Sequence, residues 1–323
     1  MICSLHLCLP EYYYTRKDVS KLKAKLTNVS TSVSEYGMTT ETKGNLENYQ
    51  VRILDDRIYF NGSIGKYYHG NNVVSLTKDD LKEALKKLKK TTGLQIYKAD
   101  VCRIDIAMNI VLPHKFKSYT PFLENTPDYL VGRDKFGGMR YKTRQGNIEF
   151  VFYDKLRELR NRDELTYNLT KGYVGKGCMM RIEARIVKTA RKTLLPKASK
   201  LMAVHLLSET VHRRLIWVWK KHYNKIPKSK SPRLRFDVSG LKELKDILAT
   251  YALHTIGLKD VLTDIEEMAR QGEWSAKKKS TVRRGIKDLH QDEFLGKTSH
   301  YIKEMEEAVR ENEEMREWVA AWG

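Results

Sequence analysis

Three segments of the chain alternate between apolar and polar side chains with the period of a β-strand: residues 101–111, 147–155 and 178–188. Side chains two positions apart lie on the same face of a strand. The apolar face is expected to carry Cys102, Ile104, Ile106, Met108, Ile110, Ile148, Phe150, Phe152, Met180, Ile182, Ala184 and Ile186. The opposite face is expected to carry Arg103, Asp105, Ala107, Asn109, Glu149, Tyr153, Arg181, Glu183 and Arg185. The pattern predicts a sheet with an apolar back and a front of carboxylates surrounded by arginines.

Other strand and helix signals also come before residue 190. Residues 1–10 favour a first strand, residues 50–61 a hairpin that turns at Asp55–Asp56, and residues 139–153 a second hairpin. Thr77 with Asp80 three residues later forms a capping box, which predicts the start of a helix. Residues 28–44 are rich in Ser and Thr and lack apolar periodicity, so they predict a loop.

Strand signals almost vanish after residue 189. Residues 198–223 have helical periodicity and contain Trp217 and Trp219, for which packing on the sheet is favoured over stacking on bases. Residues 275–289 form a strongly basic helical stretch, and residues 304–317 an acidic one. We therefore expect an α+β fold, with a central, mostly antiparallel sheet and flanking helices, followed by an α-helical C-terminal domain. Because 323 residues exceed the usual size of one core, the expected domains are 1–190 and 191–323.

Charge narrows the class of partner. The chain has 60 Lys and Arg residues against 40 Asp and Glu residues, and its net charge is +20. Such an excess favours a polyanion, with candidate DNA contacts at Lys277, Lys278, Arg283 and Arg284. No apolar run reaches the roughly 20 residues of a spanning helix, so a membrane is not an expected partner. The four cysteines form no Cys-x-x-Cys pair and predict buried free thiols in a reducing cytoplasm.

The strand motifs resemble those of a known family. Cys-Arg-Ile-Asp-Ile-Ala at 102–107, Phe-Val-Phe-Tyr-Asp-Lys at 150–155 and Met-Arg-Ile-Glu-Ala-Arg-Ile at 180–186 follow in the order found in the replication initiators of filamentous phages, the gene II/X family. Gly-Lys-Tyr-Tyr-His-Gly-Asn-Asn at 65–72 is similar in kind and placement. The resemblance covers residues 45–190 and extends to rolling-circle plasmid initiators.

The resemblance implies an origin-specific endonuclease. Such an enzyme nicks one DNA strand with a tyrosine nucleophile and a divalent metal, leaves a 3′-OH for rolling-circle synthesis, and later rejoins the displaced strand. Residues 1–190 would then be a Rep- or relaxase-like nicking and joining domain, and residues 191–323 would contact DNA or support the sheet. The implied partners are the origin duplex, its single strand, and a helicase and polymerase of the bacterial host, in whose cytoplasm the protein would work.

The expected metal ligands are Asp105 and Glu183, with Glu149 or Asn109 as a third. Oxygen ligands favour Mg²⁺ or Mn²⁺. Relaxases commonly carry a paired-histidine strand, whereas His69 and His114 stand alone here. The alternative for both acids is a structural ion pair with Arg103, Arg181 or Arg185. Those arginines are otherwise expected to clamp phosphates.

The nucleophile is one of 18 tyrosines. Tyr167 and Tyr173 lie between the Tyr-Asp-Lys motif and the Glu183 strand, where the family implies the attacking residue, and Tyr167 is preferred. Tyr153 is a further candidate. Lys155 is expected to neutralise a phosphate or to assist the leaving 3′ oxygen, with a solvated lysine as the alternative.

Two other function classes stay open. A non-catalytic, sequence-specific DNA-binding protein would need only the basic surface. A metal-dependent nuclease that uses water would keep Asp105 and Glu183 but would need no tyrosine. A covalent protein–DNA link distinguishes the tyrosine mechanism from both.

Overall fold

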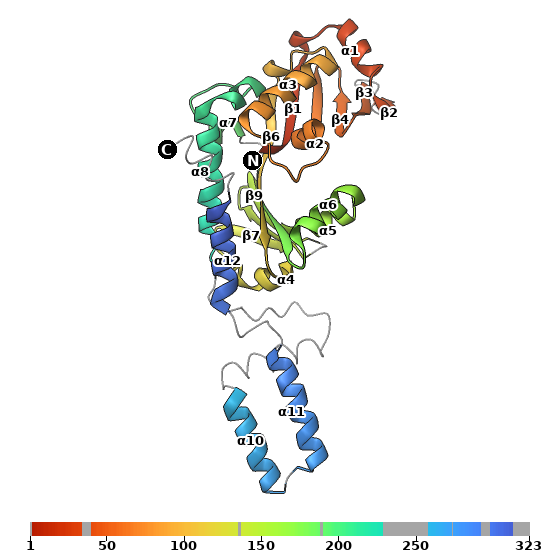
Figure 1. Ribbon diagram of the computed structural model, residues 1–323. Coiled ribbons are helices and arrows are strands. Elements are labelled where there is room, and N and C mark those ends of the chain that lie inside the picture. The colour runs from red at the N-terminus through yellow and green to blue at the C-terminus, as the bar shows by residue number, and fades with distance from the viewer. Residues whose placement is uncertain are drawn as a thin grey trace.

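One antiparallel sheet organises the molecule (Figure 1). The computed structural model describes residues 2–33, 40–134, 137–187, 190–228, 258–272, 274–291 and 298–312. Within these residues ten strands form the sheet in the order β2-β3-β4-β5-β1-β6-β10-β9-β8-β7. Their bounds are β1 (Ile2–Pro10), β2 (Thr27–Val33), β3 (Thr40–Leu46), β4 (Tyr49–Ile53), β5 (Arg57–Gly62), β6 (Asp100–Leu112), β7 (Tyr129–Arg133), β8 (Met139–Thr143), β9 (Ile148–Asp154) and β10 (Cys178–Val187).

Helices occur between the strands and after the last one. The α-helices are α1 (Arg16–Lys23), α2 (Ile64–His69), α3 (Lys78–Thr92), α4 (Phe116–Tyr119), α5 (Lys155–Arg160), α6 (Glu164–Val174), α7 (Ala190–Leu194), α8 (Glu209–Lys225), α10 (Leu258–Arg270), α11 (Ala276–Gln291) and α12 (Thr298–Glu311). Short 3-10 turns are η1 (Glu11–Tyr13), η2 (Ile96–Lys98), η3 (Thr120–Phe122) and η4 (Ala203–Leu207).

The antiparallel sheet with helices, and the helices that follow it, confirm the broad fold prediction. The three motif strands are neighbours, since β10 lies between β6 and β9. Asp105 pairs with Arg185 across β6 and β10, and Glu183 pairs with Val151 across β10 and β9. The finer likeness to relaxase sheets and the division at residue 190 stay predictions.

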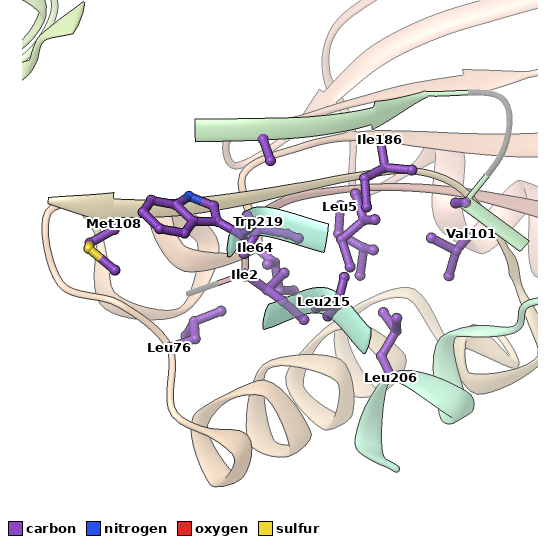
Figure 2. Close-up of a cluster of buried hydrophobic side chains, with 14 of the residues drawn as sticks. Ile2, Leu5, Ile64, Leu76, Val101, Met108, Ile186, Leu206, Leu215 and Trp219 are labelled. Carbon is purple, nitrogen blue, oxygen red and sulfur yellow. The ribbon is translucent and has the colours of Figure 1, made fainter. Parts of the chain in front are cut away.

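The apolar back of the sheet forms the main core with helices from both halves of the chain. Ile104 and Ile106 of β6 and Ile182 of β10 are fully buried in it. Trp219 of α8 belongs to this core (Figure 2), and its indole Nε1 donates to the Ile182 carbonyl at 3.3 Å. Packing of Trp219 on the sheet is thus confirmed, whereas Trp217 is 47% exposed.

Local signals placed the hairpins and one helix correctly. β4 and β5 turn at Asp55–Asp56, and β8 and β9 turn before Ile148. Thr77 caps α3, and its hydroxyl accepts from the Asp80 amide while the Asp80 carboxylate accepts from the Thr77 amide.

Two predictions were wrong. The loop expected at 28–44 contains β2 and part of β3, because an edge strand that is exposed on both faces needs no apolar alternation. Cys102 is exposed rather than buried, since a register shift places His6 opposite Arg103 and Leu7 opposite Val101. Cys102 is left over at this bulge. The other cysteines, Cys3, Cys8 and Cys178, are free and buried as expected.

The second half of β6 has a strand on one side only. β1 begins with Ile2 opposite Ile106, so among the described strands only β10 pairs with β6 beyond that point. Helix α12 lies beside this half (Figure 1), and the Asn312 amide donates to the Asn109 carbonyl at 3.0 Å. Helices α10 and α11 pack against each other. No helix among the described residues is both long and apolar enough to cross a membrane.

Candidate functional site: a network of acids and arginines

The polar side chains of β6, β9 and β10 form one connected network. We call this surface the front face, and it comprises Arg103, Asp105, Asn109, Glu149, Tyr153, Arg181, Glu183 and Arg185. The strand alternation predicted from the sequence brings these side chains to one side of the sheet. Every carboxylate in this set accepts a hydrogen bond from an arginine.

Glu183 is at the centre of the front face and is almost completely buried. Its Oε1 accepts from Arg185 Nε at 2.6 Å, and its Oε2 accepts from Arg181 Nε at 3.1 Å and from the Tyr153 hydroxyl at 3.2 Å. Burial alone raises the pKa of Glu183, but the charges of Arg185 and Arg181 outweigh it and hold the pKa below its usual value. Glu183 is therefore ionised at neutral pH.

Asp105 is buried beside this centre. Its two oxygens accept from Arg103 Nε and Nη2, both at 2.7 Å. Burial raises the pKa of Asp105 above its usual value, the bonds from Arg103 oppose this rise, and the negative charge of Glu183 adds to it. Asp105 lies opposite Arg185 on β10, two residues from Glu183, so the two carboxylates are diagonal neighbours across the sheet.

A loop of the 65–72 motif is fastened to the front face. The loop comprises residues 71–74, and we call it the 71–74 loop. The Asn72 carbonyl accepts from Arg181 Nη1 at 2.9 Å, and the Val73 carbonyl accepts from Asn109 Nδ2 at 2.7 Å. Asn72 Oδ1 also accepts from Lys155 Nζ at 2.8 Å. The sequence marked this motif but gave no role to Asn72, which joins three parts of the chain.

Lys155 is fully buried at the start of α5. Its ammonium bonds to Asn72 and to the carboxylate of Glu158. Burial, with a smaller contribution from the charge of Arg181, lowers the pKa of Lys155 to about 8. A lysine with such a pKa is protonated at pH 7 and loses its proton in the mildly alkaline range, and its complete burial rules out the alternative of an ordinary solvated lysine.

The candidate tyrosines differ in their surroundings. Tyr167 of α6 is partly buried against a small cluster formed by Leu156, Val174 and Met179, which Val73 also contacts. Tyr173 is 79% exposed on the same helix. Burial and the charge of Glu183 raise the pKa of Tyr153 well above its usual value, which disfavours its phenolate.

The front face carries carboxylate oxygens, each of them already bonded to arginines. An ionised carboxylate has about four lone-pair sites. Asp105 uses two of them and Glu183 three, so both retain acceptor capacity although arginines hold them. Glu149 accepts from Arg185 at 3.0 Å and Arg140 at 3.2 Å. Mg²⁺ and Mn²⁺ prefer oxygen ligands of this kind.

Comparison with models of protein families shows to which family the chain belongs. The family model for the N-terminal region of the phage replication-associated protein encoded by gene II matches residues 11–203, more than half of the 323 residues. The chain belongs to this family. The resemblance to gene II-type replication initiators of filamentous phages, drawn from the strand motifs, is confirmed. No curated protein matches the chain.

The matched range includes the whole front face, the 71–74 loop and α6. It excludes α10 and α11, and therefore Lys277, Lys278, Arg283 and Arg284. Lys277, Lys278 and Arg284 are exposed on α11, whereas Arg283 is half-buried and pairs with Glu266 of α10. Of the predicted DNA contacts outside the family range, Lys277, Lys278 and Arg284 are therefore more accessible to a phosphate than Arg283.

The sequence missed one further cluster. His114, which follows β6, lies close to His300 and Glu304 of α12. His69, the other isolated histidine, has its Nε2 3.6 Å from a carboxylate oxygen of Asp80. The sequence contains one signal for this cluster: His300 and Glu304 are four residues apart, which places both side chains on one face of a helix.

Proposed function

We propose that this replication-associated protein is an origin-specific nickase and rejoining enzyme that uses Tyr167 as nucleophile. The front face supports the proposal: Asp105 and Glu183 are diagonal neighbours on β6 and β10 among arginines, and Tyr167 packs on the same apolar cluster as Val73 of the 71–74 loop. Membership of a replication-associated family supports it. Origin DNA is the proposed substrate, and a host helicase and polymerase are the proposed later partners.

The proposed step exchanges one phosphate ester for another. Tyr167 Oη bonds to the phosphorus and the bond from phosphorus to the 3′ oxygen breaks. The phenol gives its proton to water, and the leaving 3′ oxygen takes one from a proton donor. A divalent cation bound by Asp105 and Glu183, with Glu149 as a third ligand, would polarise the phosphate oxygens. Arg103, Arg181 and Arg185 would neutralise the remaining charge. The ester retains the bond energy that rejoining requires.

Lys155 is the proposed proton donor to the 3′ oxygen. Its pKa of about 8 lets it hold a proton at neutral pH and release it readily. Because Lys155 is buried against Asn72, the 71–74 loop must shift before DNA can reach it.

The experiment uses supercoiled plasmid carrying the cognate origin, the full chain and Mn²⁺, followed by denaturation and protease digestion. A nicked circle with a peptide on its 5′ end supports the tyrosine mechanism. We expect Tyr167→Phe to lose this adduct while retaining origin binding, and Tyr173→Phe, on the same helix, to form it normally. Loss of the adduct in Tyr173→Phe alone would transfer the role to Tyr173.

The two other function classes give different products. A plain 5′-phosphate at the nick would favour a water nucleophile. Binding without a nick in Mg²⁺ or Mn²⁺ would favour a non-catalytic protein, a result that the full pairing of Asp105 and Glu183 with arginines would explain.

A further inference from the structure

A cluster of two histidines and a glutamate joins α12 to the end of β6. His114 follows β6, and His300 and Glu304 lie one turn apart on α12. One ligand atom from each of the three lies within 4.8 Å of the others. Among the described residues no other group of three His, Cys, Asp or Glu side chains is this close, and Asp105, Glu149 and Glu183 are therefore farther apart. Both imidazoles direct Nε2 at the same oxygen: Glu304 Oε1 is 3.5 Å from His114 and 2.5 Å from His300.

A hydrogen bond on the side away from the histidines orients the carboxylate of Glu304. The hydroxyl of Tyr119, a fully buried residue, donates to the second oxygen, Oε2, at 2.8 Å. The Tyr119 hydroxyl also accepts from the backbone amide of His114 at 3.3 Å. This arrangement leaves Oε1 facing the histidines. A metal-binding carboxylate is commonly oriented by such an outer hydrogen bond.

We propose that His114, His300 and Glu304 bind a transition-metal ion of the Zn²⁺ class. Two imidazole nitrogens with one carboxylate oxygen form a set that suits Zn²⁺, whereas Mg²⁺ prefers oxygen alone. Ligand distances of about 2.0–2.2 Å place tetrahedral ligands about 3.4 Å apart. The His114–Glu304 pair already has this spacing, and the exposed His300 side chain would move away from Glu304 by about 1 Å to reach it.

The chemistry of the cluster favours a cation over a simple ion pair. A divalent ion accepts a lone pair from each neutral imidazole and from the carboxylate, so all three polar groups are satisfied together.

The proposed ion is separate from the front face. Leu112 lies seven positions after Asp105 on β6, which is about 23 Å along a strand, and His114 lies beyond that. Its role would be to hold α12 against the end of β6, because His114 follows that strand by two residues and the other two ligands belong to the helix. The proposal does not depend on the nicking mechanism.

Metal binding by the full chain tests the proposal directly. The protein is stripped with chelator and titrated with Zn²⁺, and with Co²⁺, whose visible absorption reports tetrahedral coordination. We expect one equivalent to bind, His114→Gln and His300→Gln each to weaken binding by at least tenfold, and Tyr119→Phe to weaken it by about tenfold. His205→Gln is the matched control, since His205 accepts from the Met202 amide at 3.1 Å and lies outside the cluster.

Hydrogen exchange supplies a readout that is independent of activity. Zn²⁺ should slow amide exchange in α12 of the wild-type protein and of His205→Gln, but not of His300→Gln. If wild-type protein binds neither ion stoichiometrically at micromolar concentration, or if both cluster variants bind as well as wild type, the three residues form only an ion pair.

Discussion

Replacing Glu183 by Gln should destabilise the protein more than any other charge-removing change on the front face. The carboxylate accepts three hydrogen bonds, and its partner Arg181 is only 2% exposed. A glutamine would present an amide N–H to one guanidinium, leave the buried Arg181 without a carboxylate partner, and leave Arg185 with Glu149 alone. Breaking a buried pair in this way costs about 3–5 kcal/mol.

Glu149→Gln is the matched control. Glu149 also bonds to two arginines, but its side chain is 18% exposed and that of Arg140 is 46% exposed. Water can therefore screen the lost charge, and we expect a cost of about 1 kcal/mol. Urea unfolding at pH 7, followed by tryptophan fluorescence and far-UV circular dichroism, measures both free energies.

The difference between the two variants is the informative quantity. If Glu183→Gln costs no more than Glu149→Gln, the network does not hold Glu183 as the distances indicate. Under folding conditions Glu183→Gln should also lose Mn²⁺-dependent nicking. A folded variant that nicks normally with Mn²⁺ would remove Glu183 from the proposed metal site.

Three further outcomes follow from particular contacts. Lys155 binds its proton less tightly in the native state than in the unfolded chain, so the free energy of unfolding should rise with pH between about 8 and 10.5. Urea titrations at several pH values measure this rise, and Lys155→Met should lose most of it. Gly177→Ala should destabilise the protein because its Cβ would lie 2.0 Å from the Leu112 carbonyl oxygen, whereas Gly172→Ala in open space on α6 should stabilise it by about 0.5–1 kcal/mol; equal melting temperatures would contradict this contrast. Replacing the exposed Lys277, Lys278 and Arg284 with Ala should reduce the salt dependence of DNA binding, measured by fluorescence anisotropy, whereas Arg283→Ala, already paired with Glu266, should change it less.

The sequence predicted the motif strands because one face of the sheet is buried. Period-two alternation fixes which residues face the core. It therefore predicts that Asp105 and Glu183 lie on the opposite face of the sheet, together. The same logic failed for β2, which buries neither face, and for Cys102, where a bulge interrupts the period. Alternation carries no information on either feature.

Contacts between distant parts of the chain lay beyond the sequence patterns. Asn72 meets Arg181 across 109 residues, and Tyr119 meets Glu304 across 185. Neither pair has a local signature, because the approach depends on how loops and helices close over the finished sheet. The fixed spacing of His300 and Glu304 was visible, but its third member, His114, was not.

Because β6 is paired on one side only beyond Ile106, α12 covers a strand edge that would otherwise be open. Between Ala107 and Leu112 the strand would offer free backbone donors and acceptors to another chain if the helix left. Loss of α12, by proteolysis or by truncation, should therefore lead to self-association through strand addition rather than to a shorter monomeric protein.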